Sequence, residues 1–213
     1  GRPGRMKAIQ EFVKYVKNHK EVWFAKRIEI ADHWKKHHPY IPSKLSPYEM
    51  SKKEFIKIFG NVFEHSSWVA EKTYLRGVNP SMENADALHR FMCLEFRLSS
   101  NSEKLKVLKS HPDLALGKVK KFNKLTVSSK TEQKNAGLTS LTEKEQIDFN
   151  QLNIDYQKKF NHPFIIAVKG KTRSQILRQF KTRLNNSRQE EFNTACNEVE
   201  KIAGFRIQEI FNS

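Results

Sequence analysis

Helical periodicity from about residue 48 to the C-terminus constrains the fold of this chain more than any other feature of its sequence. Three segments begin with a capping box, in which a Ser or Thr and a Glu three residues later satisfy free amides of the first helical turn. The boxes are formed by Ser51 with Glu54, Thr142 with Glu145, and Ser187 with Glu190. Apolar stripes at helical spacing follow them, comprising Phe55, Phe59, Val62 and Phe63, then Phe149, Leu152, Tyr156 and Phe160, and finally Phe192, Ala195, Cys196, Val199, Ile202 and Ala203. We therefore predict an all-α helical bundle over residues 48–213.

The first 38 residues follow a different pattern. Ile9, Phe12 and Val16 recur at helical spacing, and the apolar run at 22–25 is typical of a short buried strand. A second helical pattern follows, and then a stretch with three prolines and no periodicity. We predict a short helix-strand-helix segment over 1–38, a linker over 39–47 and the helical domain over 48–213.

The chain is strongly basic, with a formal net charge of +16 at pH 7. A basic chain attracts anions, so three classes of partner are possible: nucleic acid, an acidic membrane surface, or a small anionic substrate. Lys and Arg are scattered along the chain, and neither an RNA-binding aromatic signature nor a zinc-finger spacing accompanies them. We interpret most of the charge as solvated surface and expect neither nucleic acid nor a membrane as partner.

The cysteines and the apolar runs of the sequence indicate the cellular compartment in which we expect the protein. Cys93 and Cys196 lie in apolar helical patterns, which predicts two buried thiols in a reducing, cytoplasmic environment. The longest purely apolar run, at 164–168, is far shorter than a membrane-spanning helix. The sequence begins with Gly1 instead of an initiator methionine, and we expect it to be part of something longer.

His111 is the first candidate for chemistry. It lies where a helical pattern with Val107 and Leu108 ends, and Pro112 prevents the helix from continuing. A histidine at a helix C-terminus feels the negative end of the helix dipole, which favours its protonated form and suits a proton donor. The alternative is a C-capping histidine with no catalytic duty.

Three further features could complete a site. In the polar connection predicted over 111–141, Glu132 and Gln133 point in different directions, so one could hold the imidazole while the other contacts a substrate amide. A solvated polar turn is the alternative for this pair. The run 164–168 could present backbone N–H and C=O groups to a flat ligand, or could simply be core. Arg206 lies among apolar neighbours and needs an anion, either a protein carboxylate or a substrate carboxylate.

Metal and nucleotide chemistry find little support in the sequence. His33 and His37 have the one-turn spacing of a helical metal site, but no third ligand with suitable spacing accompanies them. The sequence also lacks a glycine-rich phosphate loop, a nucleophile elbow and a dinucleotide fingerprint. We predict no metal and no cofactor.

Four ordered motifs together resemble the OHCU decarboxylase family, where OHCU is 2-oxo-4-hydroxy-4-carboxy-5-ureidoimidazoline. The motifs are FEHSSWVAE at 63–71, HPDLA at 111–115, SKTEQKNAGL at 129–138 and PFIIAVKG at 163–170. Two positions depart from the family pattern, because Ser67 stands where proline is common and Asn161 where glycine is common. The resemblance implies an all-helical, dimeric, cofactor-free carboxy-lyase that forms (S)-allantoin from OHCU during urate degradation.

The resemblance also implies roles for individual residues. His111 would be the catalytic proton donor, oriented by Glu132. Arg206 would bind the carboxylate of the small anionic substrate. The remaining substrate-binding residues would be Pro112, Ser129, Gln133, Phe164, Ile165, Ile166, Ala167 and Val168.

Residues 1–38 resemble the C-terminal end of a polysaccharide-deacetylase-like allantoinase, as in a bifunctional fusion. Two alternatives to the decarboxylase remain at this point. One is a basic helical module that binds nucleic acid, suggested by the net charge and by the lysine-rich segment 118–124. The other is a helical scaffold that has kept the fold without the chemistry.

Overall fold

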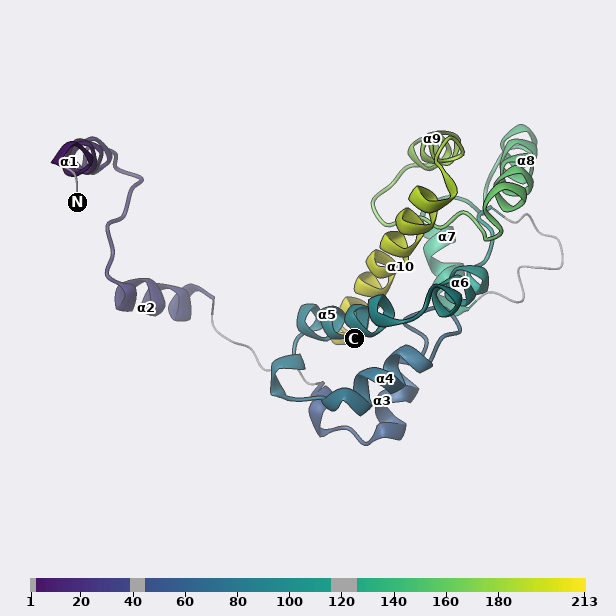
Figure 1. Cartoon of the computed structure of the whole chain (residues 1–213), viewed down its shortest axis with the longest axis horizontal. Coiled ribbons are helices and arrows are strands. Elements are labelled where there is room, and N and C mark those ends of the chain that lie inside the picture. The colour runs from purple at the N-terminus through teal and green to yellow at the C-terminus, as the bar shows by residue number, and fades with distance from the viewer. Residues whose placement is uncertain (1–2, 39–44, 116–125) are drawn as a thin grey trace. The chain divides into compact units, whose positions relative to one another are not determined.

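The computed structural model describes residues 3–38, 45–115 and 126–213, and the chain divides into two compact units, Gly1–Pro42 and Ser43–Ser213 (Figure 1). All regular elements in the described residues are helical, so the predicted all-α fold is confirmed. Two short 3₁₀ helices, η1 and η2, accompany the α-helices of the second unit. The bounds are α1 Pro3–Lys17, α2 Arg27–His37, η1 Pro47–Glu49, α3 Lys52–Phe59, α4 Trp68–Gly77, η2 Pro80–Met82, α5 Ala85–Leu98, α6 Asn101–Ser110, α7 Val127–Asn135, α8 Glu143–Phe160, α9 Arg173–Arg183 and α10 Arg188–Phe211.

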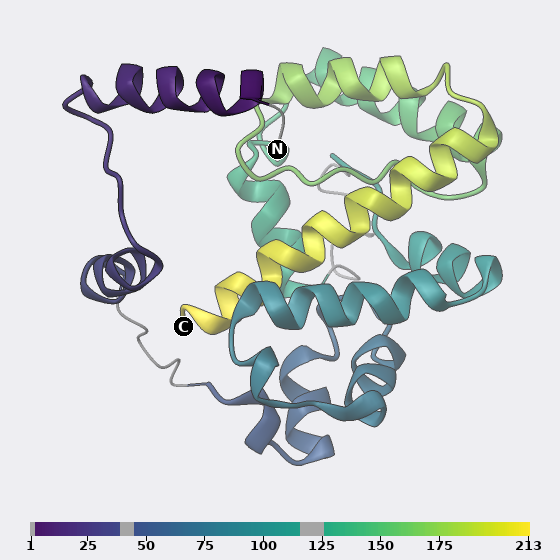
Figure 2. The ribbon, with the colours of Figure 1, turned by 60° about the vertical axis from the view of Figure 1, so that its left-hand side comes forward.

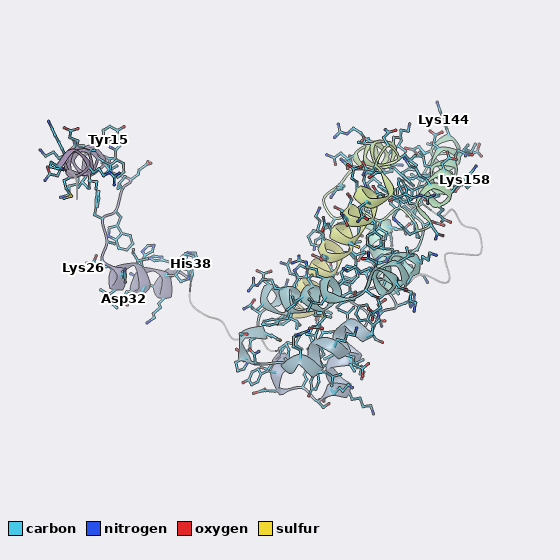
Figure 3. All side chains as sticks on the ribbon, in the orientation of Figure 1. Tyr15, Lys26, Asp32, His38, Lys144 and Lys158 are labelled. Carbon is cyan, nitrogen blue, oxygen red and sulfur yellow. The ribbon has the colours of Figure 1, made fainter. Side chains whose placement is uncertain are left out.

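The prediction of a strand at 22–25 is wrong. In the first unit these residues connect α1 and α2 without regular structure, and Trp23 and Phe24 are 55% and 50% exposed. A strand needs a second strand to satisfy its backbone hydrogen bonds, and the described residues provide none. The side chains of Tyr15 and Asp32, on α1 and α2, are likewise exposed (Figure 3). The predicted linker falls largely on residues 39–44, which lie outside the described residues.

The second unit contains two apolar cores. The first gathers side chains of α3, α4, α5 and α10, with Phe55, Phe59 and Leu88 fully buried. The second gathers α8 and α9, with Phe149 and Phe180 at its centre. The long helix α10 passes from the neighbourhood of α9 to that of α5 (Figures 1 and 2). It therefore carries residues that reach both parts of the unit.

An extended segment at 163–168 joins the two cores. Ile165 and Ala167 belong to the first core, whereas Phe164, Ile166 and Val168 belong to the second. Successive side chains of an extended backbone point to opposite sides, which explains this alternation. The apolar run of the sequence is therefore a shared wall, buried on both faces.

The connection predicted over 111–141 contains a helix, α7, that the sequence pattern did not indicate. Its residues are mostly polar and show no apolar stripe, so periodicity gave no signal. The helix begins at a side-chain cap, since the Thr126 hydroxyl accepts a hydrogen bond from the Ser129 N–H at 3.2 Å. Ser129, Glu132 and Gln133 are thus held on one helix, where the prediction placed a long connection.

Asn161 ends α8 in the left-handed region, with φ 62°. Asparagine tolerates this conformation better than most residues with a Cβ. The cap turns the chain sharply from α8 into the extended segment. Lys144 and Lys158 project from α8 toward solvent (Figure 3), as expected for a basic surface.

Candidate active site

A small cavity of about 30 Å³ lies where α6, α7, α10 and the extended segment meet. Nearly all of the predicted site residues line it, although they come from distant parts of the sequence. Its wall consists of His111, Pro112, Leu114, Ser129, Glu132, Gln133, Phe164, Ile165, Ile166, Val168, Ile202 and Arg206. Ala167 is missing from this wall and lines a neighbouring cavity of about 450 Å³, which shares Glu132, Val168 and Ile202 with the first.

His111 caps the C-terminus of α6 and is 7% exposed. The helix dipole favours a protonated imidazole, but burial is the larger effect and lowers the pKa of His111 to about 4. Two favourable interactions oppose this effect without overcoming it, the hydrogen bond to Val107 and the negative charge of Glu64. The imidazole is therefore neutral at pH 7.

The hydrogen bond of His111 also fixes its tautomer. Nδ1 lies 2.9 Å from the Val107 carbonyl oxygen, which can only accept, so Nδ1 carries the hydrogen. In a neutral imidazole Nε2 is then unprotonated and can accept a proton. The free protein thus holds His111 as a base whose Nε2 must gain a proton before it can donate one.

Arg206, on α10, is buried between two carboxylates. Its Nη1 donates to Glu64 Oε2 at 2.8 Å, and its Nε and Nη2 donate to the two oxygens of Glu132 at 2.8 and 3.1 Å. Nη2 also donates to the Ser129 hydroxyl at 3.1 Å. Burial alone would lower the pKa of Arg206, but the two carboxylates hold it above its usual value. Of the two anions predicted for Arg206, the structure supplies the protein carboxylate.

The structure places Glu132 and Gln133 differently from the sequence-based expectation. Glu132 was expected to orient His111, but both of its carboxylate oxygens bind the Arg206 guanidinium, whose planar fork matches a carboxylate. Gln133 was considered for a substrate amide, yet its side chain accepts from the Ala115 N–H at 3.1 Å and donates to the Asp113 carbonyl at 3.2 Å. It therefore fixes the loop that follows His111.

One edge of the extended segment is occupied by charged side chains. Arg183 donates to the Ile165 carbonyl at 2.8 Å, and Glu198 accepts from the Ala167 N–H at 2.8 Å. Alternate residues of an extended chain reverse direction, so we expect the N–H and C=O of Ile166 at the opposite edge. Ile166 itself lines the small cavity.

Glu64 is a site residue that sequence reasoning missed, although it lies within a quoted motif. Its side chain is 1% exposed and accepts from Thr126 Oγ1 at 2.8 Å and Ser129 Oγ at 2.9 Å, besides Arg206. Burial favours its neutral form, but the charge of Arg206 and the hydrogen bond from Thr126 keep its pKa below the usual value. No local pattern marks it, since the polar residues 65–67 follow it directly.

Other chemistries receive no support from the described residues. Burial raises the pKa of Cys93 to about 12, so its thiol is not an activated nucleophile. Within the described ranges no group of three His, Cys, Asp or Glu is arranged to hold a metal ion. Across the same ranges, no helix has both the length and the apolar content that crossing a bilayer requires.

The fold and this cavity define an all-helical protein with a buried histidine, arginine and carboxylate site for a small polar molecule. The chain belongs to the OHCU decarboxylase family, whose sequence profile matches residues 48–208. This confirms the resemblance drawn from the four motifs.

Individual proteins show the same relationship. The chain is 43% identical over 163 residues to the uric acid degradation bifunctional protein of Bacillus sp. (strain TB-90), covering 76% of this chain but only 31% of that protein. It is 34% identical to the 2-oxo-4-hydroxy-4-carboxy-5-ureidoimidazoline decarboxylase of Halalkalicoccus jeotgali, covering 76% of this chain and 88% of the relative. A crystal structure of (S)-allantoin synthase superposes with a TM-score of 0.60 at 27% identity, covering 77% of this chain and 52% of that one.

Proposed function

We propose that this chain is a cofactor-independent carboxy-lyase that converts OHCU to (S)-allantoin in urate degradation. The observation that carries the proposal is the neutral, buried imidazole of His111 sharing one cavity with Arg206 and Glu132. Membership of the OHCU decarboxylase family and the names of the relatives support the choice of substrate.

Arg206 is the group that binds the substrate carboxylate in this proposal. In the free protein it is held by Glu64, whose side chain is 1% exposed, and by Glu132, whose side chain is 27% exposed. The exposed partner is the one that a substrate carboxylate can replace, because its carboxylate regains water on leaving the guanidinium. Binding then frees Glu132 within the cavity while Arg206 keeps Glu64.

The substrate needs more room than the small cavity offers. A volume of about 30 Å³ has space for a water molecule or two. The adjoining cavity of about 450 Å³ shares three wall residues with it. We expect substrate to enter from that side, with displacement of Glu132 opening the connection.

The chemistry requires a proton acceptor and a proton donor in sequence. When the bond between C4 and the carboxylate breaks, its electrons enter the ring and are absorbed by the adjacent C=N, whose nitrogen takes a proton. The 4-hydroxyl then loses its proton as a carbonyl forms, and C5 gains one. His111 Nε2 can take the hydroxyl proton and return it to C5, which is general acid–base catalysis by one imidazole.

In this proposal, protonation from one side gives a single product configuration. The Ile166 N–H and C=O at the edge of the extended segment can hold the flat ring, with Phe164 and Val168 against it. Since His111 lies on one wall, protonation from one face sets the S configuration.

The test is formation of optically active allantoin from freshly oxidised urate, followed by circular dichroism. We expect the purified chain to accelerate it and His111→Ala to abolish the acceleration with its helical content unchanged. His33→Ala, which alters an exposed histidine of the first unit, is the control and should retain full activity. A wild type without acceleration would favour the scaffold alternative.

We also propose that the chain forms a homodimer and acts in the cytoplasm, and that residues 1–38 belong to an allantoinase-like domain fused upstream. The division of the chain at residues 42 and 43 supports a separate N-terminal unit. Binding to labelled nucleic acid at physiological salt tests the remaining alternative, and we expect none.

A further inference from the structure

Glu64 lies in the turn between α3 and α4, remote in sequence from the other site residues. The residue after it, His65, has φ 45° in the left-handed region, and its side chain is 55% exposed. The Glu64 side chain is buried in this turn, and His65 Nε2 lies 4.0 Å from Glu64 Oε1 at its exposed side. A residue buried in this way, with its charge retained, must find compensation inside the protein.

The Glu64 side chain binds two elements of the site. Thr126 and Ser129, at the start of α7, donate their hydroxyls to its two oxygens, and Arg206 of α10 donates from Nη1. Arg206 Nη1 also lies 3.3 Å from the Val62 carbonyl of the same turn. The carboxylate thus fixes α7 and α10 to one another through a single buried group.

The Glu64 backbone binds the third element. Its carbonyl accepts hydrogen bonds from Ser110 Oγ at 2.7 Å and Ser66 Oγ at 2.9 Å. Ser110 is the last residue of α6 and directly precedes His111. One residue therefore connects the three helices that supply the imidazole, the polar residues of α7 and the guanidinium.

The charge of Glu64 acts on the same groups. It is the anion that favours a protonated His111, whereas Arg206 and His65 disfavour it. Glu132 is bound to Arg206 from the other side. When His111 takes a proton during the reaction, its buried imidazolium requires a nearby anion, and Glu64 is in place before substrate arrives.

We propose that Glu64 is a positioning residue. It holds His111, Ser129 and Arg206 in place relative to one another, and it provides the negative charge that compensates a protonated His111. This inference rests on the proposed decarboxylase function. Glu64 contacts Arg206 through one nitrogen of the guanidinium, and Glu132 still holds the other two when Glu64 is replaced. We therefore expect the removal of Glu64 to lower kcat much more than it raises KM.

The test compares three variants with wild type in the allantoin assay. Glu64→Gln keeps the size of the side chain and removes its charge, and we expect kcat to fall about 10- to 100-fold with KM within about threefold. Glu64→Asp keeps the charge but shortens the reach, and we expect a kcat at least about threefold above that of the Gln variant. Glu200→Gln removes another largely buried carboxylate paired with an arginine, Arg97, outside the site, and should retain wild-type kcat.

Each outcome bears on one proposal. A Gln variant with kcat within twofold of wild type overturns the positioning role, and so does an equal loss in Glu200→Gln. If the Gln variant does not fold, Glu64→Asp decides: a wild-type kcat overturns the inference, and a reduced kcat at unchanged KM supports it. A wild type without turnover refutes the proposed function and this inference together, whereas an active wild type with an unaffected Glu64→Gln refutes the inference alone.

Discussion

At His111 two electrostatic effects act in opposite directions. The C-terminus of α6 favours a cation, but such dipole effects amount to at most about 2 kcal/mol. Full burial of an imidazole disfavours the cation and can shift a pKa by about 3 to 5 units. Burial is the larger effect here and lowers the pKa of His111 to about 4. The residue is therefore kept as a neutral base with one defined tautomer.

This shift predicts acid sensitivity of the folded state. Between pH 6.5, near the pKa of an unfolded histidine, and pH 4, the unfolded chain binds a proton that the folded protein does not. Stability is therefore lost as pH falls through this window. We expect wild type to lose about 2 kcal/mol more unfolding free energy than His111→Gln between pH 7 and pH 5, measured by urea denaturation. Equal losses in the two proteins would contradict the low pKa of His111.

His111 and Arg206 were identifiable from sequence because each combines a polar side chain with a local pattern that explains its position. Glu64 was not, since its partners Ser129 and Arg206 lie 65 and 142 residues away. The protonation of His111 was also beyond sequence reasoning. It depends on how completely α7, α10 and the extended segment cover the ring, and no local pattern reports that coverage.

At the scale of helices and turns, capping chemistry was the reliable signal. The boxes at Ser51, Thr142 and Ser187 were confirmed as the starts of α3, α8 and α10. Two others, at Ser100 and Thr172, start α6 and α9. Capping groups act within one helical turn, so the local sequence reveals them. The helix α7 was missed because it has no apolar stripe. The strand at 22–25 was wrongly predicted because a strand also depends on a partner strand, which a local pattern does not show.

A buried charge cluster joins three helices behind the extended segment. Glu191 of α10 accepts from Tyr156 of α8, from Arg183 of α9 and from Asn186, and it is fully buried. Arg183 in turn donates to the Ile165 carbonyl and lies 4.5 Å from the centre of the Phe164 ring. The cluster therefore holds the backbone that the proposed substrate contacts.

Removing only the carboxylate of this cluster should strongly lower the free energy of unfolding. Glu191→Ala leaves a buried guanidinium without its anion, and we expect a loss of about 3–5 kcal/mol in unfolding free energy. Replacing both partners, Arg183→Met with Glu191→Leu, should recover most of the loss because no uncompensated charge remains. Glu190→Ala, its exposed neighbour in the capping box, is the control and should cost about 1 kcal/mol. A double variant no more stable than Glu191→Ala in urea denaturation would argue against this account.

At the scale of the whole molecule, the site belongs entirely to one of the two units. All residues lining the two cavities lie within Ser43–Ser213, as do both apolar cores. We expect a chain of residues 45–213 to match the full chain in kcat, KM and thermal unfolding temperature. A kcat reduced more than about threefold, or a lower unfolding temperature, would show that the first unit supports the site. The comparison is informative because many apolar side chains of α1 and α2 are exposed.

The net charge of +16 is also a property of the whole chain, and it should act on the rate of substrate capture. A basic field concentrates an anionic substrate near the protein, an effect worth about 10-fold or more in association rate at low salt. Raising ionic strength from 0.01 M to 1 M shortens the screening length from about 30 Å to about 3 Å. We therefore expect kcat/KM to fall about 3- to 10-fold over this range, while kcat stays constant because the buried His111, Glu64 and Arg206 are shielded from ions. Sucrose of matched osmolality is the control, and a kcat/KM that does not change with salt would mean that the surface charge takes no part in capture.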